Sequence, residues 1–253
     1  MQLKINGRKI YFSSSGSGKK LLILPGWMHD HYIWEKTQEE LSRNFQVIVL
    51  DFPGFGDSQL DNSIKDLNGY AHFTKKVIEE LDLNNFVILG HSFGGSVAIK
   101  TLSLFPKLPV EKLILVDSAC IRKFNLKQIF GLILAKSGKP IFSLPVLRSY
   151  AHQVKNMLYG ALNEHDYLNA GPLKTAMSRL IKENLEGVLD KIKIPTLIVW
   201  GENDSVTPIS HAKILNHKIP KSQLIFLKNS THWPFIEQIH DFCNTVYKFI
   251  YEK

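Results

Sequence analysis

A serine between glycines is the first feature of the sequence that could carry chemistry. Ser92 stands in the run Gly90-His91-Ser92-Phe93-Gly94, which fits the pattern Gly-x-Ser-x-Gly. An apolar run, Phe86-Val87-Ile88-Leu89, precedes this turn, and small residues open a helical stretch after it. A tight turn between strand and helix exposes such a hydroxyl, and the N–H of the next residue, Phe93, can then stabilise an oxyanion. We therefore expect Ser92 to be a nucleophile.

A serine nucleophile needs a general base, and ten histidines compete for that role. His232 lies in the loop between the last predicted strand and the last predicted helix. His91 is adjacent to the serine, and neighbouring side chains on a sharp turn point apart. His29 and His31 could line a pocket. The position of His232 late in the chain favours it as the base.

The base in turn needs a carboxylate that orients it. Asp204 follows the penultimate predicted strand, in a loop that contains a glycine and ends at Pro208. Glu202 in the same loop is one rival, and Asp117 at the end of an earlier strand is another. The order serine, acid, histidine along the chain is the order expected when a serine of this pattern follows a strand.

The elements that must position these residues are short apolar runs alternating with helical patterns. Runs that are apolar throughout predict central strands of a mostly parallel sheet with helices on both faces. The expected strands are 3–5, 9–13, 21–24, 47–50, 86–89, 112–116, 196–200 and 224–227. The expected helices are 33–44, 68–81 (with Asn68 as a plausible cap), 94–104, 209–215 and 235–251.

The middle of the chain breaks this alternation. Residues 121–187 contain helical and loop patterns but no convincing strand. We expect residues 1–120 and 188–253 to form the core and residues 121–187 to form a helical cap inserted over the sheet. Residues 121–188 carry ten Lys or Arg and four acids, interleaved with apolar side chains. The plain interpretation is a solvated lid, and the sharper one is a cationic rim that attracts an acidic partner or substrate.

Length, composition and net charge narrow the class of protein further. A chain of 253 residues with 44% apolar residues suits one large α/β domain, and two cysteines make no disulfide framework. The net charge is +8, but no basic helix or zinc-finger spacing supports nucleic-acid binding. We expect no signal peptide, no membrane span and a cytoplasmic protein, either a monomer or a dimer.

The sequence resembles the α/β-hydrolase superfamily. Five segments carry the resemblance, in the expected order: Leu24-Pro25-Gly26-Trp27, residues 51–58, residues 90–95, Gly201-Glu202-Asn203-Asp204 and Thr231-His232-Trp233-Pro234. The resemblance implies the α/β-hydrolase fold, an α/β class with a mostly parallel eight-stranded sheet flanked by helices and a helical cap insertion. It also favours Asp204 over both rivals as the acid.

The same resemblance implies an oxyanion hole made of the backbone N–H groups of Trp27 and Phe93. The family usually has a histidine where Pro25 stands, and this departure removes one hydrogen bond that braces the loop of Trp27. Asp57 or Ser58 could brace the loop that bears Trp27.

Local similarities at 26–27, 41–45 and 52–56 resemble the pimeloyl-[acyl-carrier protein] methyl ester esterases of biotin synthesis. That resemblance implies a serine carboxylesterase acting on a small-molecule or carrier-bound acyl ester, with an acidic acyl carrier protein docking at the basic cap. No metal and no organic cofactor is expected. The alternatives are a carbon–carbon bond hydrolase of the same fold and a non-catalytic binding protein that keeps the pocket.

Overall fold

A single eight-stranded sheet organises the computed structural model, which describes residues 1–121, 179–180 and 183–251. The strands are β1 (Gln2–Ile5), β2 (Arg8–Ser15), β3 (Lys19–Leu24), β4 (Phe45–Leu50), β5 (Phe86–His91), β6 (Val110–Val116), β7 (Thr196–Gly201) and β8 (Ser222–Leu227). All eight expected strands are present. The predicted cap, 121–187, lies almost entirely outside the described residues, so its boundaries stay a prediction.

The strands lie side by side in the order β1-β2-β4-β3-β5-β6-β7-β8. Strand β2 is antiparallel to both β1 and β4, and every pairing from β4 through β3 to β8 is parallel. The registers align the carboxyl ends of the central strands, with His91 beside Val116 and Val116 beside Val199. The loops that follow β5, β6, β7 and β8 therefore leave the sheet along one edge.

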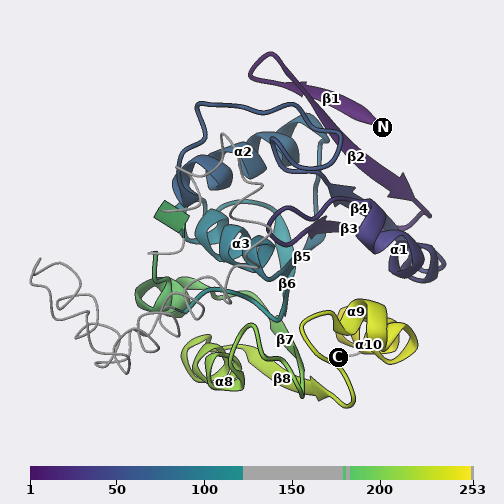
Figure 1. Cartoon of the computed structure of the whole chain (residues 1–253), viewed down its shortest axis with the longest axis vertical. Helices are drawn as coiled ribbons and strands as arrows, with labels where there is room; N and C mark the ends of the chain where they lie inside the picture. Colours follow the sequence, from purple (N-terminus) through teal and green to yellow (C-terminus); the bar gives the residue numbers. More distant parts are fainter. Residues whose placement is uncertain (122–178, 181–182, 252–253) are drawn as a thin grey trace, which may run out of the picture.

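Helices cover both faces of this sheet (Figure 1). One group comprises α2 (Leu67–Glu80), α3 (Phe93–Leu104), α8 (Ile209–Lys218) and the 3-10 helix η4 (Glu186–Lys191). The other comprises the 3-10 helix η1 (Tyr32–Trp34), α1 (Glu35–Leu41), α9 (Pro234–Glu237) and α10 (Ile239–Tyr251). Among the described residues, no helix is long and apolar enough to cross a membrane.

Alternation along the buried strands explains the two layers. Leu22 and Leu24 of β3 pack into the core on the α2 and α3 face, while Leu21 and Ile23 pack with residues of α1 and α10. Successive side chains of a strand point to opposite faces, so a strand buried on both sides must be apolar throughout. The continuous apolar runs in the sequence therefore indicated a sheet between two layers of helices.

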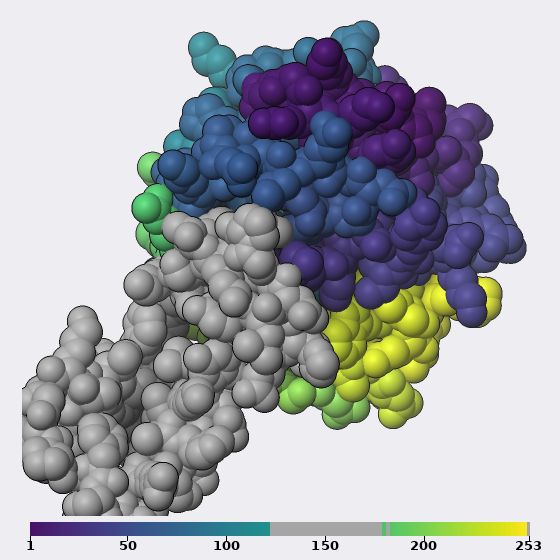
Figure 2. Space-filling model, turned by 45° about the horizontal axis from the view of Figure 1, so that its top comes forward, coloured from purple at the N-terminus to yellow at the C-terminus, as the bar shows by residue number. Residues whose placement is uncertain are grey.

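Segments distant in sequence lie side by side, with the N-terminal strands (purple) against the blue segment that follows β4 and the C-terminal region (yellow) next to the region of α1 (Figure 2). The segment after β4 lies against β2, where Tyr11 N donates to Ser58 Oγ and Gln59 N donates to the carbonyl of Lys9. The C-terminal helix lies against the region of α1, and the ring of Tyr251 stacks on Phe45 with centroids 5.4 Å apart.

Several helix boundaries differ from expectation. The helix expected over 33–44 is η1 followed by α1 and ends at Leu41, and the helix expected over 209–215 extends to Lys218. The helix expected to begin at Asn68 has Asp66 as its N-cap, because the Asp66 carboxylate accepts a hydrogen bond from Gly69 N at 2.9 Å. The single helix expected over 235–251 is two helices, α9 and α10, separated at Gln238.

Candidate active site

Ser92 occupies a strained turn between β5 and α3. Its backbone has φ 49° and ψ −113°, a region that residues other than glycine seldom adopt. Hydrogen bonds hold this geometry: Ser92 N donates to the carbonyl of Val116 at 2.9 Å, and its own carbonyl accepts from the N–H groups of Gly95 and Ala119. The turn presents Ser92 at the carboxyl end of the sheet, as the sequence pattern predicted.

Close packing behind the turn brings a second loop to it. A β-carbon on Gly94 would overlap the carbonyl oxygen of Leu24, the last residue of β3. The start of α3 therefore lies directly against the loop that contains Pro25 and Trp27. The rings of Trp27 and Phe93 meet edge to face, with centroids 5.2 Å apart.

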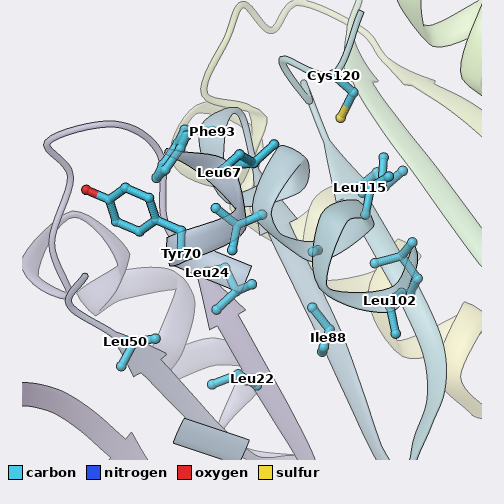
Figure 3. Close-up of a cluster of buried hydrophobic side chains, with 14 of the residues drawn as sticks. Leu22, Leu24, Leu50, Leu67, Tyr70, Ile88, Phe93, Leu102, Leu115 and Cys120 are labelled. Carbon is cyan, nitrogen blue, oxygen red and sulfur yellow. The ribbon is translucent and has the colours of Figure 1, made fainter. Parts of the chain in front are cut away.

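An aromatic cluster fixes this contact. Phe93 also packs edge to face on Tyr70 at 5.0 Å, and Trp27 packs on Phe55 at 5.1 Å. Figure 3 shows Phe93, Tyr70 and Leu24 within the same buried cluster. The backbone N–H groups of Trp27 and Phe93 thus belong to neighbouring segments, and their role as an oxyanion hole stays a prediction.

Asp51 braces the loop that bears Trp27. Its carboxylate accepts hydrogen bonds from His31 N at 2.7 Å, from His31 Nδ1 at 2.9 Å and from Asp57 N at 3.2 Å. Ser58 Oγ donates to the Asp51 carbonyl at 2.8 Å. Asp57 and Ser58 therefore act on this loop through Asp51, and His31 is held by that carboxylate.

The expected acid and base are in direct contact. His232 Nδ1 donates to Asp204 Oδ2 at 2.9 Å, and both side chains are buried. The other carboxylate oxygen of Asp204 accepts from Val206 N at 2.7 Å and Thr207 N at 2.9 Å. The Thr207 hydroxyl donates to Asp204 Oδ2 as well. Four hydrogen bonds thus orient the Asp204 carboxylate. His232 takes part through Nδ1, so its Nε2 atom is outside this network.

A glycine makes the approach of the two loops possible. A β-carbon on Gly201, at the end of β7, would overlap the carbonyl oxygen of Thr231. The Asp204 loop therefore packs against the residue that precedes His232. Asn203 N donates to the carbonyl of Ser230 at 2.9 Å across the same contact.

The two rivals of Asp204 have different surroundings. Glu202 is exposed. Asp117 is fully buried, and its Oδ1 accepts from Gly201 N at 2.9 Å. Of the three acids, Asp204 is the one whose carboxylate is hydrogen-bonded to the His232 ring among the described residues.

Two histidines pack beside the candidate base. His91 is fully buried, and its Nε2 donates to the backbone carbonyl of His232 at 2.9 Å, so that nitrogen is not available to Ser92. The ring of His29 stacks on His91 with centroids 5.8 Å apart. Sequence reasoning missed the contacts of His91 and Thr207 with the acid–base pair, because the residue types alone do not tell which atoms meet.

Burial and charge set the protonation of this region. Burial by itself raises the pKa of Asp204, but the hydrogen bond and charge of His232, with help from the side chains of Asp117 and Thr207, lower it to about 2. Burial lowers the pKa of His91 well below its ordinary value. Burial, together with the charge of His232, lowers the pKa of His29 to about 4. Asp204 is therefore ionised at neutral pH, and His29 and His91 are neutral.

Within the described residues, no hydrogen bond joins the Ser92 hydroxyl to His232. Such bonds are often long in an unliganded site and tighten when substrate binds. Two groups of side chains have donor atoms within 4.8 Å of one another, His31 with Asp51 and Asp57, and Asp117 with Asp204 and His232. Most of these atoms are already engaged in hydrogen bonds within each group or with its neighbours. We therefore assign both groups to hydrogen-bond networks rather than to metal sites.

Comparisons with known proteins agree with this fold. A profile described as the alpha/beta hydrolase family matches residues 21–245. The AB hydrolase superfamily protein YisY of Bacillus subtilis is 29% identical, with 90% of each chain covered. A pimeloyl-[acyl-carrier protein] methyl ester esterase of Vibrio campbellii is 28% identical, with 95% of this chain and 98% of that one covered. The solved esterase EaEST of Exiguobacterium antarcticum is 24% identical, with 98% and 97% of the two chains covered and a TM-score of 0.75.

Proposed function

This chain belongs to the α/β-hydrolase family, and on that premise we propose that it is a serine carboxylesterase. The observation that carries the proposal is the buried hydrogen bond between His232 Nδ1 and Asp204, at the same sheet edge as Ser92. A carboxylate on Nδ1 fixes the imidazole tautomer whose Nε2 lone pair can accept a proton. The strained turn at Ser92 supplies the hydroxyl for that base.

In the proposed mechanism, Ser92 Oγ attacks the ester carbonyl carbon while His232 Nε2 takes the hydroxyl proton. The carbonyl oxygen becomes an oxyanion, which the N–H groups of Trp27 and Phe93 stabilise. The intermediate collapses with cleavage of the carbon–oxygen bond, and His232 returns the proton to the leaving alcohol. Water, deprotonated by His232, then hydrolyses the acyl-enzyme and restores Ser92.

The experiment that tests this mechanism is hydrolysis of p-nitrophenyl esters of graded acyl length. We expect turnover by the wild-type protein and a loss of kcat of several orders of magnitude in Ser92→Ala. Ser205→Ala is the matched control, because Ser205 is exposed in the loop that carries Asp204. Equal activity of Ser92→Ala and wild type would overturn the assignment of the nucleophile.

For the substrate, we propose a methyl ester of an acyl chain carried on an acidic acyl carrier protein. Two observations support it: the full-length similarity to the pimeloyl-[acyl-carrier protein] methyl ester esterases, and the excess of ten Lys or Arg over four acids in residues 121–188. A cationic segment would raise the association rate with an acidic carrier, and salt would screen that attraction.

The carrier proposal is tested by comparing a pimeloyl methyl ester free and attached to its carrier, each at low and high salt. We expect a higher kcat/KM for the carrier-bound ester at low salt and a smaller advantage at high salt. The free ester is the internal control for salt effects on the chemistry. Equal kcat/KM for the two esters, or an advantage that salt does not reduce, would exclude docking by charge.

A further inference from the structure

Asp117 is a buried acid that the proposed mechanism does not use. It follows β6 directly and has φ 42°, a left-handed conformation that is uncommon for residues other than glycine. Its N–H donates to the carbonyl of Val199 at 3.1 Å, and its carbonyl oxygen lies 3.2 Å from Thr207 Oγ1. Its Oδ1 accepts from Gly201 N at 2.9 Å. These contacts fix both the backbone and the side chain beside the loop of Asp204.

The second oxygen of this carboxyl group has no donor. Asp117 Oδ2 is buried and accepts no hydrogen bond. One carboxyl oxygen of Asp117, one of Asp204 and a ring nitrogen of His232 all lie within 4.8 Å of one another. An ionised Asp117 would thus place a second, poorly solvated negative charge against Asp204. Two carboxyl groups at such a distance are stable when they share one proton.

The hydrogen bonds decide which carboxyl group holds that proton. Asp204 receives bonds from His232, from two backbone N–H groups and from Thr207, whereas Asp117 receives one, from Gly201. The charged form is therefore favoured at Asp204. In agreement, burial raises the pKa of Asp117 well above its ordinary value, and Asp204 and Glu237 add to that rise against the opposing Gly201 N–H.

We propose that Asp117 is a neutral carboxylic acid that donates a hydrogen bond from Oδ2 to Asp204. It is then a positioning residue, which holds the Asp204 carboxylate toward His232 without adding a second negative charge beside it. The charged or titratable groups near it are Asp204 in the loop after β7, His232 in the loop before α9 and Glu237 on α9. The positioning role rests on the proposed function, while the protonation state does not.

The proton is detected in the resting protein by infrared spectroscopy. We expect the C=O stretching band of a protonated carboxyl group at neutral pH, and we expect Asp117→Asn to remove that band. Asparagine tolerates the left-handed conformation, accepts from Gly201 N and donates from its amide, so it preserves the local geometry. A wild-type spectrum without the band would overturn the proposal even if Ser92 proves to be the nucleophile.

The positioning role is tested by the pH profile of kcat/KM. If Asp117 is neutral, Asp117→Asn leaves the acidic limb of the profile at its wild-type pH. If Asp117 is ionised, the same variant removes a negative charge near His232 and lowers that limb by about 1–3 pH units, which would contradict the proposal.

A second variant, Asp117→Leu, removes the hydrogen-bond donor. Asp117→Leu has a similar shape but no hydrogen bond, and we expect kcat to fall roughly tenfold to a hundredfold, with KM little changed and with activity restored by asparagine. Equal loss in the leucine and asparagine variants would contradict the need for a donor. Thermal unfolding shows whether the leucine variant is folded, and if it is not, the infrared band and the Asp117→Asn profile decide the question.

Discussion

Thr207 contacts both members of the acid–base pair, Asp204 and His232. Its hydroxyl donates to Asp204 Oδ2 and lies 3.4 Å from His232 Nδ1. Its backbone carbonyl accepts from Trp200 Nε1 at 3.1 Å, which ties the loop to β7. One residue thus fixes both the position of the carboxylate and the path of the loop that carries it.

We predict that Thr207→Val weakens both stability and activity. Valine keeps the shape but removes a buried hydroxyl bonded to a carboxylate, which costs about 2 kcal/mol of unfolding free energy. We expect kcat/KM for a p-nitrophenyl ester to fall about tenfold because Asp204 loses one of its constraints. Urea unfolding and steady-state kinetics measure the two effects. Thr207→Ser retains the hydroxyl, so a serine variant as impaired as the valine variant would contradict this explanation.

His91 acts on the backbone of His232 rather than on its ring. We predict that His91→Phe lowers kcat roughly tenfold with KM nearly unchanged, because the His232 carbonyl loses its buried donor and the imidazole shifts. His91→Gln offers an amide N–H near the position of Nε2 and is the matched control. Single-turnover kinetics that show an unimpaired chemical step in His91→Phe would refute the role.

At the residue scale, residue type, chain order and the family resemblance predicted Ser92, Asp204 and His232 as one set, and the structure brings Asp204 and His232 into contact. Their order and the strand before each of them are visible in the sequence. The hydrogen-bond partners were not predictable, because Thr207 and His91 are ordinary residues of a loop and a strand end. Their contribution depends on tertiary contacts between segments 25 and 141 residues apart.

At the scale of the elements, helix ends also depend on tertiary contacts that the sequence does not reveal. Local alternation predicted every strand, but α9 and α10 separate at Gln238 for a reason that lies elsewhere in the fold. Glu237 accepts from the backbone and hydroxyl of Thr231, and Gln238 Nε2 donates to the carbonyl of Asn229 at 3.2 Å. These bonds hold the loop before His232 and break a helix that the hydrophobic pattern alone would continue.

The packing of α3 on β3 leads to a prediction about Gly94. We expect Gly94→Ala to lower the unfolding free energy by roughly 1–3 kcal/mol, because the new β-carbon overlaps the Leu24 carbonyl and the elements must separate. Activity should fall as well, since Ser92 and Trp27 would move apart. Thermal unfolding and kcat/KM measure both effects. Gly187→Ala is the matched control, because nothing lies within 4 Å of its β-carbon, and equal effects at both glycines would rule out this steric cause.

At the scale of the whole molecule, the parallel order of β5 to β8 brings the candidate site together. Ser92, Asp117, Asp204 and His232 follow four neighbouring strands and so meet at one edge of the sheet. The sequence predicted this edge because the strands are apolar throughout and alternate with helices. The substrate was not predictable in the same way, because the strands determine where the candidate residues meet and not which acyl group binds there.

The buried histidines at this edge make stability depend on pH. His29 has a pKa of about 4 in the folded protein, against an ordinary value of 6.5. As the pH falls from 6.5 to about 4, the unfolded chain binds a proton at this site and the folded protein does not. Stability is therefore lost over that interval, by an amount on the order of 2 kcal/mol from this residue. The contribution of Asp204 is lost only at lower pH, below its unfolded value of 3.8.

We predict that His29→Phe flattens this part of the stability profile. Phenylalanine can still stack on His91 but binds no proton, so the variant should gain stability relative to wild type as the pH falls from 6.5 to about 4. Urea unfolding midpoints across that interval, compared between the two proteins at each pH, isolate this residue from the opposing titration of Asp117. His240→Phe is the matched control, because His240 is exposed on α10. A constant difference between His29→Phe and wild type at every pH would mean that burial does not hold His29 neutral.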